Sequence, residues 1–465
     1  MSSLLMSYLL ATLGISPADA WAGFRGDGTS TTYATRLPLT WSSEENVAWR
    51  VALPGYGQSS PVVLGDKVFV TAINGSEKET LIVIAIDARK GALLWKREFQ
   101  ATQKGKNNPA MSRGAPTPLV DLRGVYAFFE SGDVIALDHE GQVLWQRALT
   151  KDYGPFQNNH GLASSPTQTD SSMIVLVDHG GPSYLLALDK TNGKNLYRTE
   201  RLSRMSWTSP IVSSIGGRDV VLVSSSGSLT AYDARSGELI WEVDDLNGNN
   251  IPSPVFSEGY LVIGAGENRL KPDLAASQRS NCCLKLSEGE PGYEVVWRGR
   301  KAVAHHASPL IHAGHVYIVS KPGVVYCLDL KTGEERYVER LDNPCWATPI
   351  GAGDRIYFFG KDGVTTVLQA GPKYKKLATN RLWSDAELQA RKEEARKRPE
   401  NRIPVSFGGS PPGGKGPTPP ATLSPAQREA MIAEAVGDVV YGVAAVDGAF
   451  YVRTGTELIC IRARE

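Results

Sequence analysis

The sequence predicts an all-β fold, a single eight-bladed β-propeller built from four-stranded antiparallel blades. Three observations support this prediction: a strand unit that recurs along the chain, a turn motif that recurs inside the unit, and incomplete units at the two chain ends. A length of 465 residues would otherwise suggest about three domains of ordinary size. Because repeats of about 40 to 50 residues are typical of stacked sheets, one closed domain is the better prediction.

Each recurring unit starts with a serine or threonine followed by proline, and continues as short strands separated by turns. The first copy is SSPVVLGDKVFVTA, followed by LIVIAID. Proline suits the first residue of a strand, where its missing N–H costs little. The seven prolines are Pro61, Pro118, Pro166, Pro210, Pro254, Pro309 and Pro349. An eighth, degenerate copy begins near Gly442, after a longer interval that contains an insertion.

Within the units, a turn of the form Asp-x-x-x-Gly-x-x-x-Trp/Tyr recurs at nearly constant spacing. Asp can bond the turn amides, glycine supplies the positive φ of a tight hairpin, and the aromatic residue can pack against the neighbouring blade. The copies are Asp87/Gly91/Trp95, Asp138/Gly141/Trp145 (one residue shorter), Asp189/Gly193/Tyr197, Asp233/Gly237/Trp241 and Asp329/Gly333/Tyr337. A single sheet of this size cannot bury both faces, so we expect the sheets to stack around an axis.

The two chain ends predict how the ring closes. The last unit ends at ELICIRARE with no fourth strand after it, whereas Asn46–Leu53 reads as a fourth strand with no preceding three. Pairing this segment with Glu457–Arg462 completes an eighth blade from both ends of the chain. Such closure removes the open sheet edges that a propeller must hide.

The charge balance and the N-terminal segment restrict the class of protein. The chain has 50 Lys+Arg against 49 Asp+Glu, a formal net charge of +1, which argues against nucleic-acid binding. Residues 1–20 combine a short apolar stretch with Ala18 and Ala20, and predict a secretory signal peptide that is removed before Trp21. Residues 21–45 are then a lead-in to a propeller at residues 46–465. We expect a monomeric, extracytoplasmic protein, periplasmic or secreted, with no membrane-spanning helix.

Residues 383–436 interrupt the repeats between copies seven and eight. The segment from Ser384 has helical composition with interspersed charges. Between Pro404 and Pro420, 11 of 17 residues are Gly or Pro, a composition that does not form a packed core. Ser424-Pro425-Ala426-Gln427 is typical of a helix start and predicts a second short helix ending near Val436. The insertion is either a solvated loop or an arm that binds a partner.

The repeats, together with the segment WAGFRGDGTST at residue 21, resemble the PQQ-like propeller repeats over most of the chain. That family includes quinoprotein alcohol dehydrogenases and BamB, the non-enzymatic propeller of the machinery that assembles outer-membrane proteins. The resemblance implies an eight-bladed propeller in an extracytoplasmic space, and the chain is most similar to the BamB-like branch. It does not choose an activity, because one fold hosts many functions.

The cysteines and the catalytic motifs favour a protein without a cofactor. In the quinone enzymes, the resemblance implies pyrroloquinoline quinone with calcium, stacked on a disulfide between adjacent cysteines. Here Cys282 and Cys283 open a predicted strand, so their side chains should point to opposite faces of the sheet. Cys327 and Cys460 occupy positions held by alanine in other copies and are predicted to be small core residues. No phosphate-binding loop, nucleophile elbow or zinc motif is present, and we expect no metal site.

The loops that lead into the innermost strands should ring one mouth of the central channel. Hydrogen-bonding and aromatic side chains gather in these loops, as a ligand or peptide site requires. They are Gln58, Arg113, His160, Trp207, Asn249, Asn250, His305, His306, Cys345 and Trp346, with Tyr56 near the same mouth. We therefore predict an exported, non-catalytic binding or scaffolding protein whose partner is a protein segment or a small molecule. The alternatives are a PQQ-dependent alcohol or sugar dehydrogenase and an assembly factor for outer-membrane proteins specifically.

Overall fold

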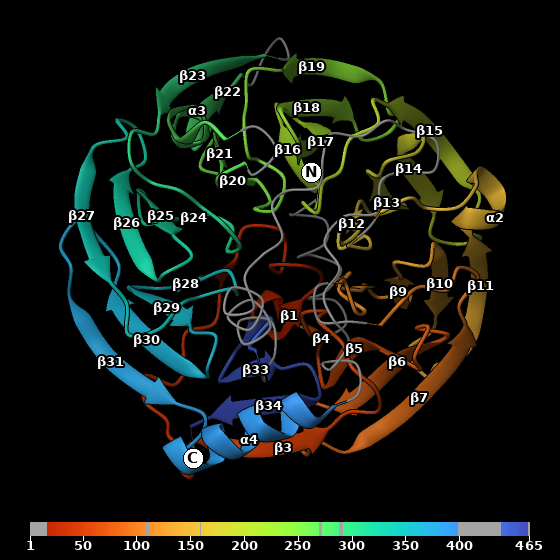
Figure 1. The fold of residues 1–465 in the computed structure, drawn as a ribbon, viewed down its shortest axis with the longest axis horizontal. Helices are drawn as coiled ribbons and strands as arrows, with labels where there is room; N and C mark the ends of the chain where they lie inside the picture. The colour runs from red at the N-terminus through yellow and green to blue at the C-terminus, as the bar shows by residue number, and fades with distance from the viewer. Residues whose placement is uncertain are drawn as a thin grey trace.

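The structure is a computed structural model that describes residues 16–107, 111–158, 160–268, 272–287, 292–398 and 439–463. In this part of the chain, eight antiparallel blades surround a central axis (Figure 1), which confirms the predicted propeller. From the innermost to the outermost strand, blade one contains β4 (Val62–Leu64), β5 (Lys67–Asn74), β6 (Thr80–Asp87) and β7 (Leu93–Gln100), and blade two contains β8 (Leu119–Val120), β9 (Val125–Phe128), β10 (Asp133–Leu137) and β11 (Val143–Ala148). Blade three contains β12 (Thr167–Gln168), β13 (Ser172–Val177), β14 (Ser183–Asp189) and β15 (Asn195–Arg201), and blade four contains β16 (Ile211–Ile215), β17 (Arg218–Ser225), β18 (Ser228–Asp233) and β19 (Leu239–Val243).

The second half of the ring repeats the same order. Blade five contains β20 (Val255–Ser257), β21 (Tyr260–Ile263), β22 (Cys282–Leu286) and β23 (Tyr293–Arg298), and blade six contains β24 (Leu310–His312), β25 (His315–Val319), β26 (Val324–Asp329) and β27 (Glu335–Arg340). Blade seven contains β28 (Ile350–Ala352), β29 (Arg355–Phe359), β30 (Val364–Gln369) and β31 (Lys376–Arg381), and blade eight contains β32 (Gly442–Val446), β33 (Ala449–Arg453), β34 (Glu457–Arg462) and, outermost, β3 (Val47–Ala52). Loops between blades therefore emerge on one face, the mouth face, and the turns between third and fourth strands emerge on the opposite face, the turn face.

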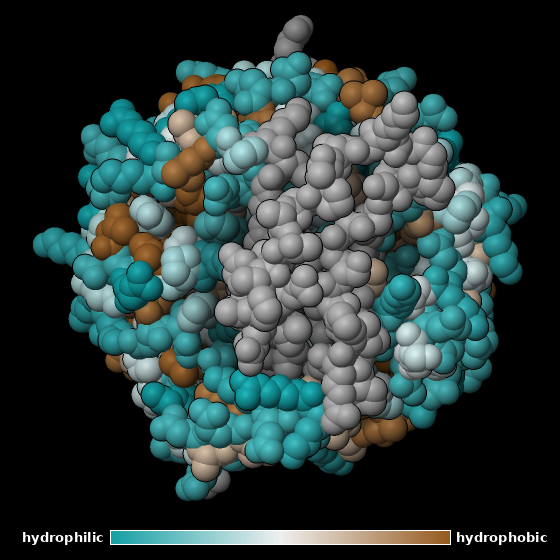
Figure 2. Space-filling model, in the orientation of Figure 1, coloured by the Kyte–Doolittle hydropathy of each residue, from teal (hydrophilic) through white to brown (hydrophobic). Residues whose placement is uncertain are grey.

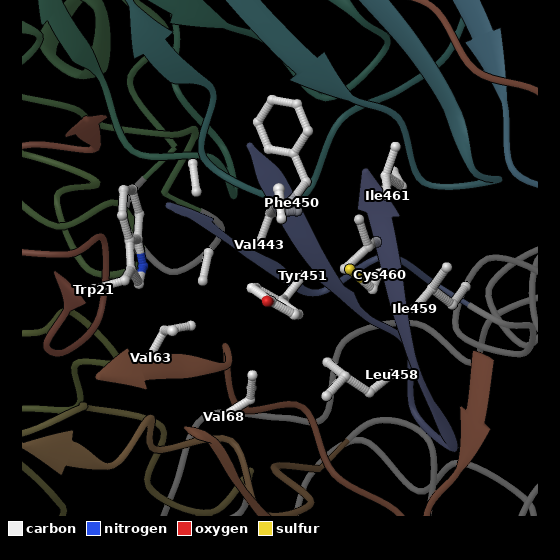
Figure 3. Packing of buried hydrophobic residues seen from close by; sticks show 14 of the residues in the cluster. Trp21, Val63, Val68, Val443, Phe450, Tyr451, Leu458, Ile459, Cys460 and Ile461 are labelled. Atoms are coloured by element: carbon white, nitrogen blue, oxygen red, sulfur yellow. The ribbon is translucent and has the colours of Figure 1, made fainter. Parts of the chain in front are cut away.

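Blade eight joins the two ends of the chain as predicted. Its outer strand β3 pairs antiparallel with β34, with Val51 opposite Leu458. Side chains of blades one and eight form one buried cluster at this junction, and Figure 3 shows Val63 and Val68 on one side and Tyr451 on the other. Burying this much apolar surface between the first and last blades holds the ring closed.

The same local pattern recurs at the centre of the blades. Ala85 on β6 lies opposite Phe69 on β5 and Trp95 on β7, and a bulge follows it directly. In blade eight, Cys460 holds the equivalent place opposite Trp49. A small residue fits there because an aromatic side chain on the outer strand folds across it. Cys327 and Cys460 are both fully buried.

On the turn face, the recurring motif joins each blade to the next. In blade one, the Asp87 carboxylate accepts hydrogen bonds from the backbone N–H of Arg89 at 2.9 Å and of the following residue at 2.7 Å. The indole of Trp95 then reaches blade two and donates to the carbonyl of His139 at 2.8 Å. A Cβ at residue 141 would lie 2.8 Å from the Trp95 ring, so Gly141 is required by this close approach as well as by its φ of +83°.

A belt of hydroxyl groups joins blades one to seven around the channel. In each of these blades the residue before the leading proline is Ser or Thr, and its hydroxyl accepts a hydrogen bond from the backbone N–H of its counterpart in the preceding blade. The six links are Ser60 to Thr117 (2.9 Å), Thr117 to Ser165 (3.0 Å), Ser165 to Ser209 (2.9 Å), Ser209 to Ser253 (2.8 Å), Ser253 to Ser308 (3.0 Å) and Ser308 to Thr348 (3.2 Å). The Ser/Thr-Pro signature therefore satisfies buried N–H groups across blade boundaries.

The lead-in runs along the inner strands that line the channel. It forms β1 (Ala20–Trp21), which pairs with β4, and β2 (Thr31–Thr32), which pairs with β28. Between these strands, Arg25 is buried and donates to the carbonyl of Pro254 in blade five at 2.7 Å. Figure 1 shows β1 close to the centre of the ring. The lead-in thus occupies part of the channel.

The lead-in also covers the junction of blades seven and eight. Blade eight is assembled from both chain ends, so it has no turn between its third and fourth strands to receive an aromatic residue. Blade seven accordingly has Ala378 at the position of that aromatic residue. Trp41 packs at this junction instead, 5.8 Å from the ring of Phe450 and 6.1 Å from that of Phe359, with its N–H bonded to Asn380 at 3.0 Å.

Helices are short and peripheral. They are η1 (Pro17–Asp19), α2 (Leu149–Tyr153), α3 (Leu274–Arg279) and α4 (Asp385–Lys397), and none in the described part of the chain is long and apolar enough to cross a membrane. Helix α4 begins the insertion with a capping box between Ser384 and Glu387. Arg391 on α4 reaches Glu457 in blade eight at 2.6 Å, which fixes the helix to the ring. The predicted second helix from Ser424 lies outside the described residues.

Candidate functional site at the channel mouth

The predicted mouth residues of blades one and two form a pair. The side-chain oxygen of Gln58 accepts from the backbone N–H of Arg113 at 2.9 Å, and the Gln58 N–H donates to the Arg113 carbonyl at 3.1 Å. The Arg113 guanidinium lies 3.6 Å above the ring of Tyr56. The hydroxyl of Tyr56 is 2.7 Å from that of Tyr441 in blade eight, and burial raises the pKa of Tyr56 well above its usual value. Blades eight, one and two are therefore linked at the mouth.

The next group links blades two to five. The backbone N–H of Ser112 donates to the carbonyl of His160 at 2.7 Å. The indole of Trp207 donates to the carbonyl of Gly161 at 2.9 Å and meets the His160 ring edge-on, at 5.8 Å between centroids. The backbone N–H of Trp207 also donates to the carbonyl of Asn250 at 2.8 Å. Here the predicted residues act mainly as contacts between neighbouring blades.

A third group lies between blades six and seven. The rings of His306 and Trp346 stack in parallel, 4.8 Å apart with 8° between their planes. The ammonium group of Lys361 lies 4.8 Å above the Trp346 ring. His305 accepts a hydrogen bond from the backbone N–H of Lys321 at 3.2 Å. The two histidines make separate contacts, which fits the prediction that they are not a metal pair.

Two other candidates belong to the interior. The Asn249 side chain is buried and donates to Ser224 at 2.9 Å and to the carbonyl of Ser228 at 2.8 Å, while it accepts from Gly227 at 2.8 Å. Cys345 is also buried, and its burial raises the pKa of the thiol to about 12. The structure thus brings the mouth candidates together as neighbouring pairs around the ring, and it assigns Asn249 and Cys345 to packing.

The polar capacity left at the mouth lies in two buried arginines. Nε and Nη1 of Arg113 and Nη1 of Arg453 have no hydrogen-bond partner in the structure. Arg453 donates only to the carbonyls of Gly57 at 3.3 Å and Thr71 at 3.4 Å, and burial lowers the pKa of its guanidinium to about 9. Such donors suit the carbonyl or carboxylate groups of a ligand. The sequence gave no signal for Arg453, because it sits at the end of an ordinary strand.

The structure also exposes apolar side chains on two neighbouring loops of the mouth face, which sequence reasoning missed. Leu202 is 73% exposed and Met205 38% exposed in the loop between β15 and β16, and Ile251 is 39% exposed in the next inter-blade loop. The hydrogen bond between Trp207 and Asn250 holds these two loops together. A repeat search cannot find such residues, because they lie in the loops that differ between copies.

The adjacent cysteines do not form a platform for a quinone. Cys282 packs into the cluster between blades four and five, and Cys283 packs into the cluster between blades five and six. Both are free thiols, and burial raises the pKa of each to about 12. Among the described residues, no group of three or more His, Cys, Asp or Glu side chains is placed to hold a metal ion. These residues do not fit calcium-bound pyrroloquinoline quinone.

Comparisons with known proteins agree with the repeat pattern. A family model described as outer membrane protein assembly factor BamB matches residues 26–159, 156–337 and 289–403. BamB of Yersinia pestis is 28% identical over 228 residues, which are 48% of this chain and 52% of that protein. A polyvinylalcohol dehydrogenase of a Pseudomonas species is 22% identical over 360 residues, which are 68% of this chain and 50% of that protein. The chain spans about half the length of the curated relatives it matches.

Among solved structures, the crystal structure of BamB from Moraxella catarrhalis is similar to this propeller. The TM-score is 0.56 at 13% identity, with 90% of this chain and 98% of that chain covered. At this level of identity the likeness concerns the fold. Because the family model covers most of the propeller, the chain belongs to the family of outer membrane protein assembly factor BamB.

Proposed function

We propose that this protein is a non-catalytic scaffold outside the cytoplasmic membrane, which binds a protein partner at its mouth face during the assembly of outer-membrane proteins. Family membership and the relatives named BamB support this role. The predicted signal peptide at residues 1–20 supports the location.

The observation that carries the proposal is the exposed apolar group Leu202, Met205 and Ile251 on the mouth face. Exposed apolar side chains that cluster within a polar surface mark sites of protein contact. Figure 2 shows mostly hydrophilic side chains around the rim of the face in view, with hydrophobic ones in separate patches. Contact with a partner would remove these three side chains from water.

The loop that carries Leu202 and Met205 is fixed before any partner binds. The hydroxyl of Ser203 donates to the carbonyl of His179 at 3.0 Å, and Arg204 bonds the hydroxyl of Ser228. The hydroxyl of Ser226 bonds the carbonyl of Met205. A loop held in its binding shape loses little conformational freedom on association, which favours affinity.

The test is affinity capture from cell envelopes, with components of the β-barrel assembly machinery identified by mass spectrometry. The wild-type protein should recover them, and the double variant Leu202→Glu/Met205→Glu should recover about tenfold less, because two charges would be buried at the interface. The control is Leu93→Glu/Leu94→Glu, which changes two exposed leucines on β7. Recovery that is unchanged by the first pair, or equally reduced by both, contradicts the proposal.

The second candidate is a quinone-dependent dehydrogenase. It is favoured by the polyvinylalcohol dehydrogenase relative, which aligns with a larger share of this chain than the Yersinia pestis BamB does. The placement of Cys282 and Cys283 in separate clusters opposes it. Purified protein mixed with pyrroloquinoline quinone and Ca²⁺ should show no dye reduction with alcohols or aldoses. Clear turnover would replace the scaffold proposal with the enzyme.

A further inference from the structure

The junctions between blades on the turn face follow one rule at five places. An aromatic side chain on the outermost strand of one blade lies under a glycine in the turn of the next blade, so close that a Cβ would clash. The five pairs are Trp49 with Gly91, Trp95 with Gly141, Trp145 with Gly193, Tyr197 with Gly237, and Trp297 with Gly333. In all four tryptophan pairs the indole N–H donates to a backbone carbonyl of that turn, at 3.3, 2.8, 2.8 and 2.8 Å.

The junction of blades four and five breaks this rule. At the place of the turn aspartate, blade five has Lys285, and its hairpin continues with Lys285 opposite Glu294 and Leu286 opposite Tyr293. Trp241 therefore meets the ring of Tyr293 at 4.9 Å instead of a glycine turn. Within the described residues, the indole N–H of Trp241 makes no hydrogen bond.

A hollow of about 210 Å³ lies beside Trp241. Its lining is mainly apolar and includes Ile215, Val220, Ile240 and Leu286, with the guanidinium of Arg218 at its edge. Since one water occupies about 30 Å³, this space is large enough for a short stretch of backbone. Next to it, Leu239 is 54% exposed and Val295 38% exposed on the two outer strands.

We propose that this hollow binds a glycine-containing turn of a partner protein, docked on Trp241 as the chain's own turns dock on its other tryptophans. The four intact tryptophan junctions define what such a ring accepts, a carbonyl for the indole N–H and backbone without a Cβ against the ring face. Trp241 offers both, and its turn is missing. The exposed Leu239 and Val295 add the apolar border that a protein partner would cover. This site lies on the turn face, so it is independent of the mouth-face proposal.

The test uses a cyclised peptide copying residues 135–144, the hairpin that docks on Trp95 through His139 and Gly141. Indole N–H signals of the full-length protein labelled with ¹⁵N-tryptophan are followed by NMR, and Trp241→Phe assigns the Trp241 signal. The peptide should shift that signal in a saturable manner at millimolar concentration. The signals of Trp95, Trp145 and Trp297 serve as internal controls and should stay in place.

The matched control is the same peptide carrying Gly141→Ala, which should bind at least about tenfold more weakly because the added Cβ meets the indole. A Trp241 signal that does not move with the glycine peptide overturns the proposal. Equal shifts with both peptides also overturn it, since binding would not depend on the turn geometry. A shift caused by maltose but not by the peptide would assign the hollow to a sugar ring and overturn it as well.

Discussion

The backbone N–H of Ser165 in blade three donates to the side-chain oxygen of Ser209 in blade four at 2.9 Å, and both residues are buried. This bond is one link of the belt that joins the leading Ser/Thr residues around the channel. The belt explains why a hydroxyl precedes each of the seven prolines. Without it, each blade would bury a backbone N–H with no acceptor at the boundary with the next.

Replacing Ser209 by alanine should lower the free energy of unfolding by about 1–3 kcal/mol, because the buried N–H of Ser165 loses its acceptor. Urea denaturation measures the change. Ser214→Ala is the matched control, since Ser214 is exposed on the strand that follows. Equal stability of the two variants would mean that the belt contributes nothing.

Gly141→Ala should destabilise the protein more than Gly65→Ala. Both glycines have positive φ, so both substitutions cost about 1–2 kcal/mol in backbone conformation. At residue 141 the Cβ would also meet the Trp95 ring at 2.8 Å, whereas at residue 65 it meets nothing within 4 Å. Overpacking of this kind adds about 1–3 kcal/mol. Thermal unfolding of the two variants isolates the clash, and equal losses would contradict the contact.

Asp329 should make stability depend on acid pH. The hydrogen bond from the Arg336 guanidinium is the largest of the causes that lower its pKa to about 2, with the turn amides adding to it. Because the folded pKa lies below the unfolded one, the contribution is complete above about pH 4 and is lost as the pH falls toward 2. Asp329→Asn should therefore be less stable than wild type at pH 7, by at most about 1 kcal/mol for such an exposed pair. The difference should vanish at pH 2, and a difference that persists there would contradict the assignment.

All five cysteines should be unreactive in the folded protein. Each is buried and free, and burial raises the pKa of each of the Cys282, Cys283, Cys327, Cys345 and Cys460 thiols to about 12. Ellman's reagent should detect none within minutes in buffer and all five in guanidinium chloride. Detection of only three in denaturant would indicate a disulfide, and the separate placement of Cys282 and Cys283 would be wrong.

Removal of the predicted signal peptide is directly measurable. Ala20 and Trp21 form β1 against β4, and Trp21 is buried in the cluster shown in Figure 3. N-terminal sequencing of protein isolated from cell envelopes should begin at Trp21. A protein that begins at Met1 would contradict export through this signal.

The sequence predicted the architecture well because the repeats encode it locally. The leading prolines mark the innermost strands, and the Gly91 and Trp95 positions mark the turn and the outer strand. Asn46–Leu53 could be paired with Glu457–Arg462 because each end lacks what the other supplies. These inferences need only period and complementarity, so the packing of the blades follows from them.

The contents of the channel and the site could not be predicted in the same way. The two-residue strands of the lead-in carry no periodicity, and the partner of Arg25 lies 229 positions away in blade five. The mouth candidates were found from their loops, but the sequence could not show that Trp207 spends its hydrogen bonds on neighbouring blades. Exposure of Leu202 follows only from how its loop is anchored, which no pattern in the chain describes.

Site-specific photo-cross-linking tests the scaffold role most directly. A photoreactive phenylalanine analogue at position 202 should form, in living cells, a covalent adduct with a component of the β-barrel assembly machinery. The same analogue at position 94, on the outer strand of blade one, should form none. Adducts from position 94 but not from position 202, or no adduct with any such component, would contradict partner binding at the mouth face.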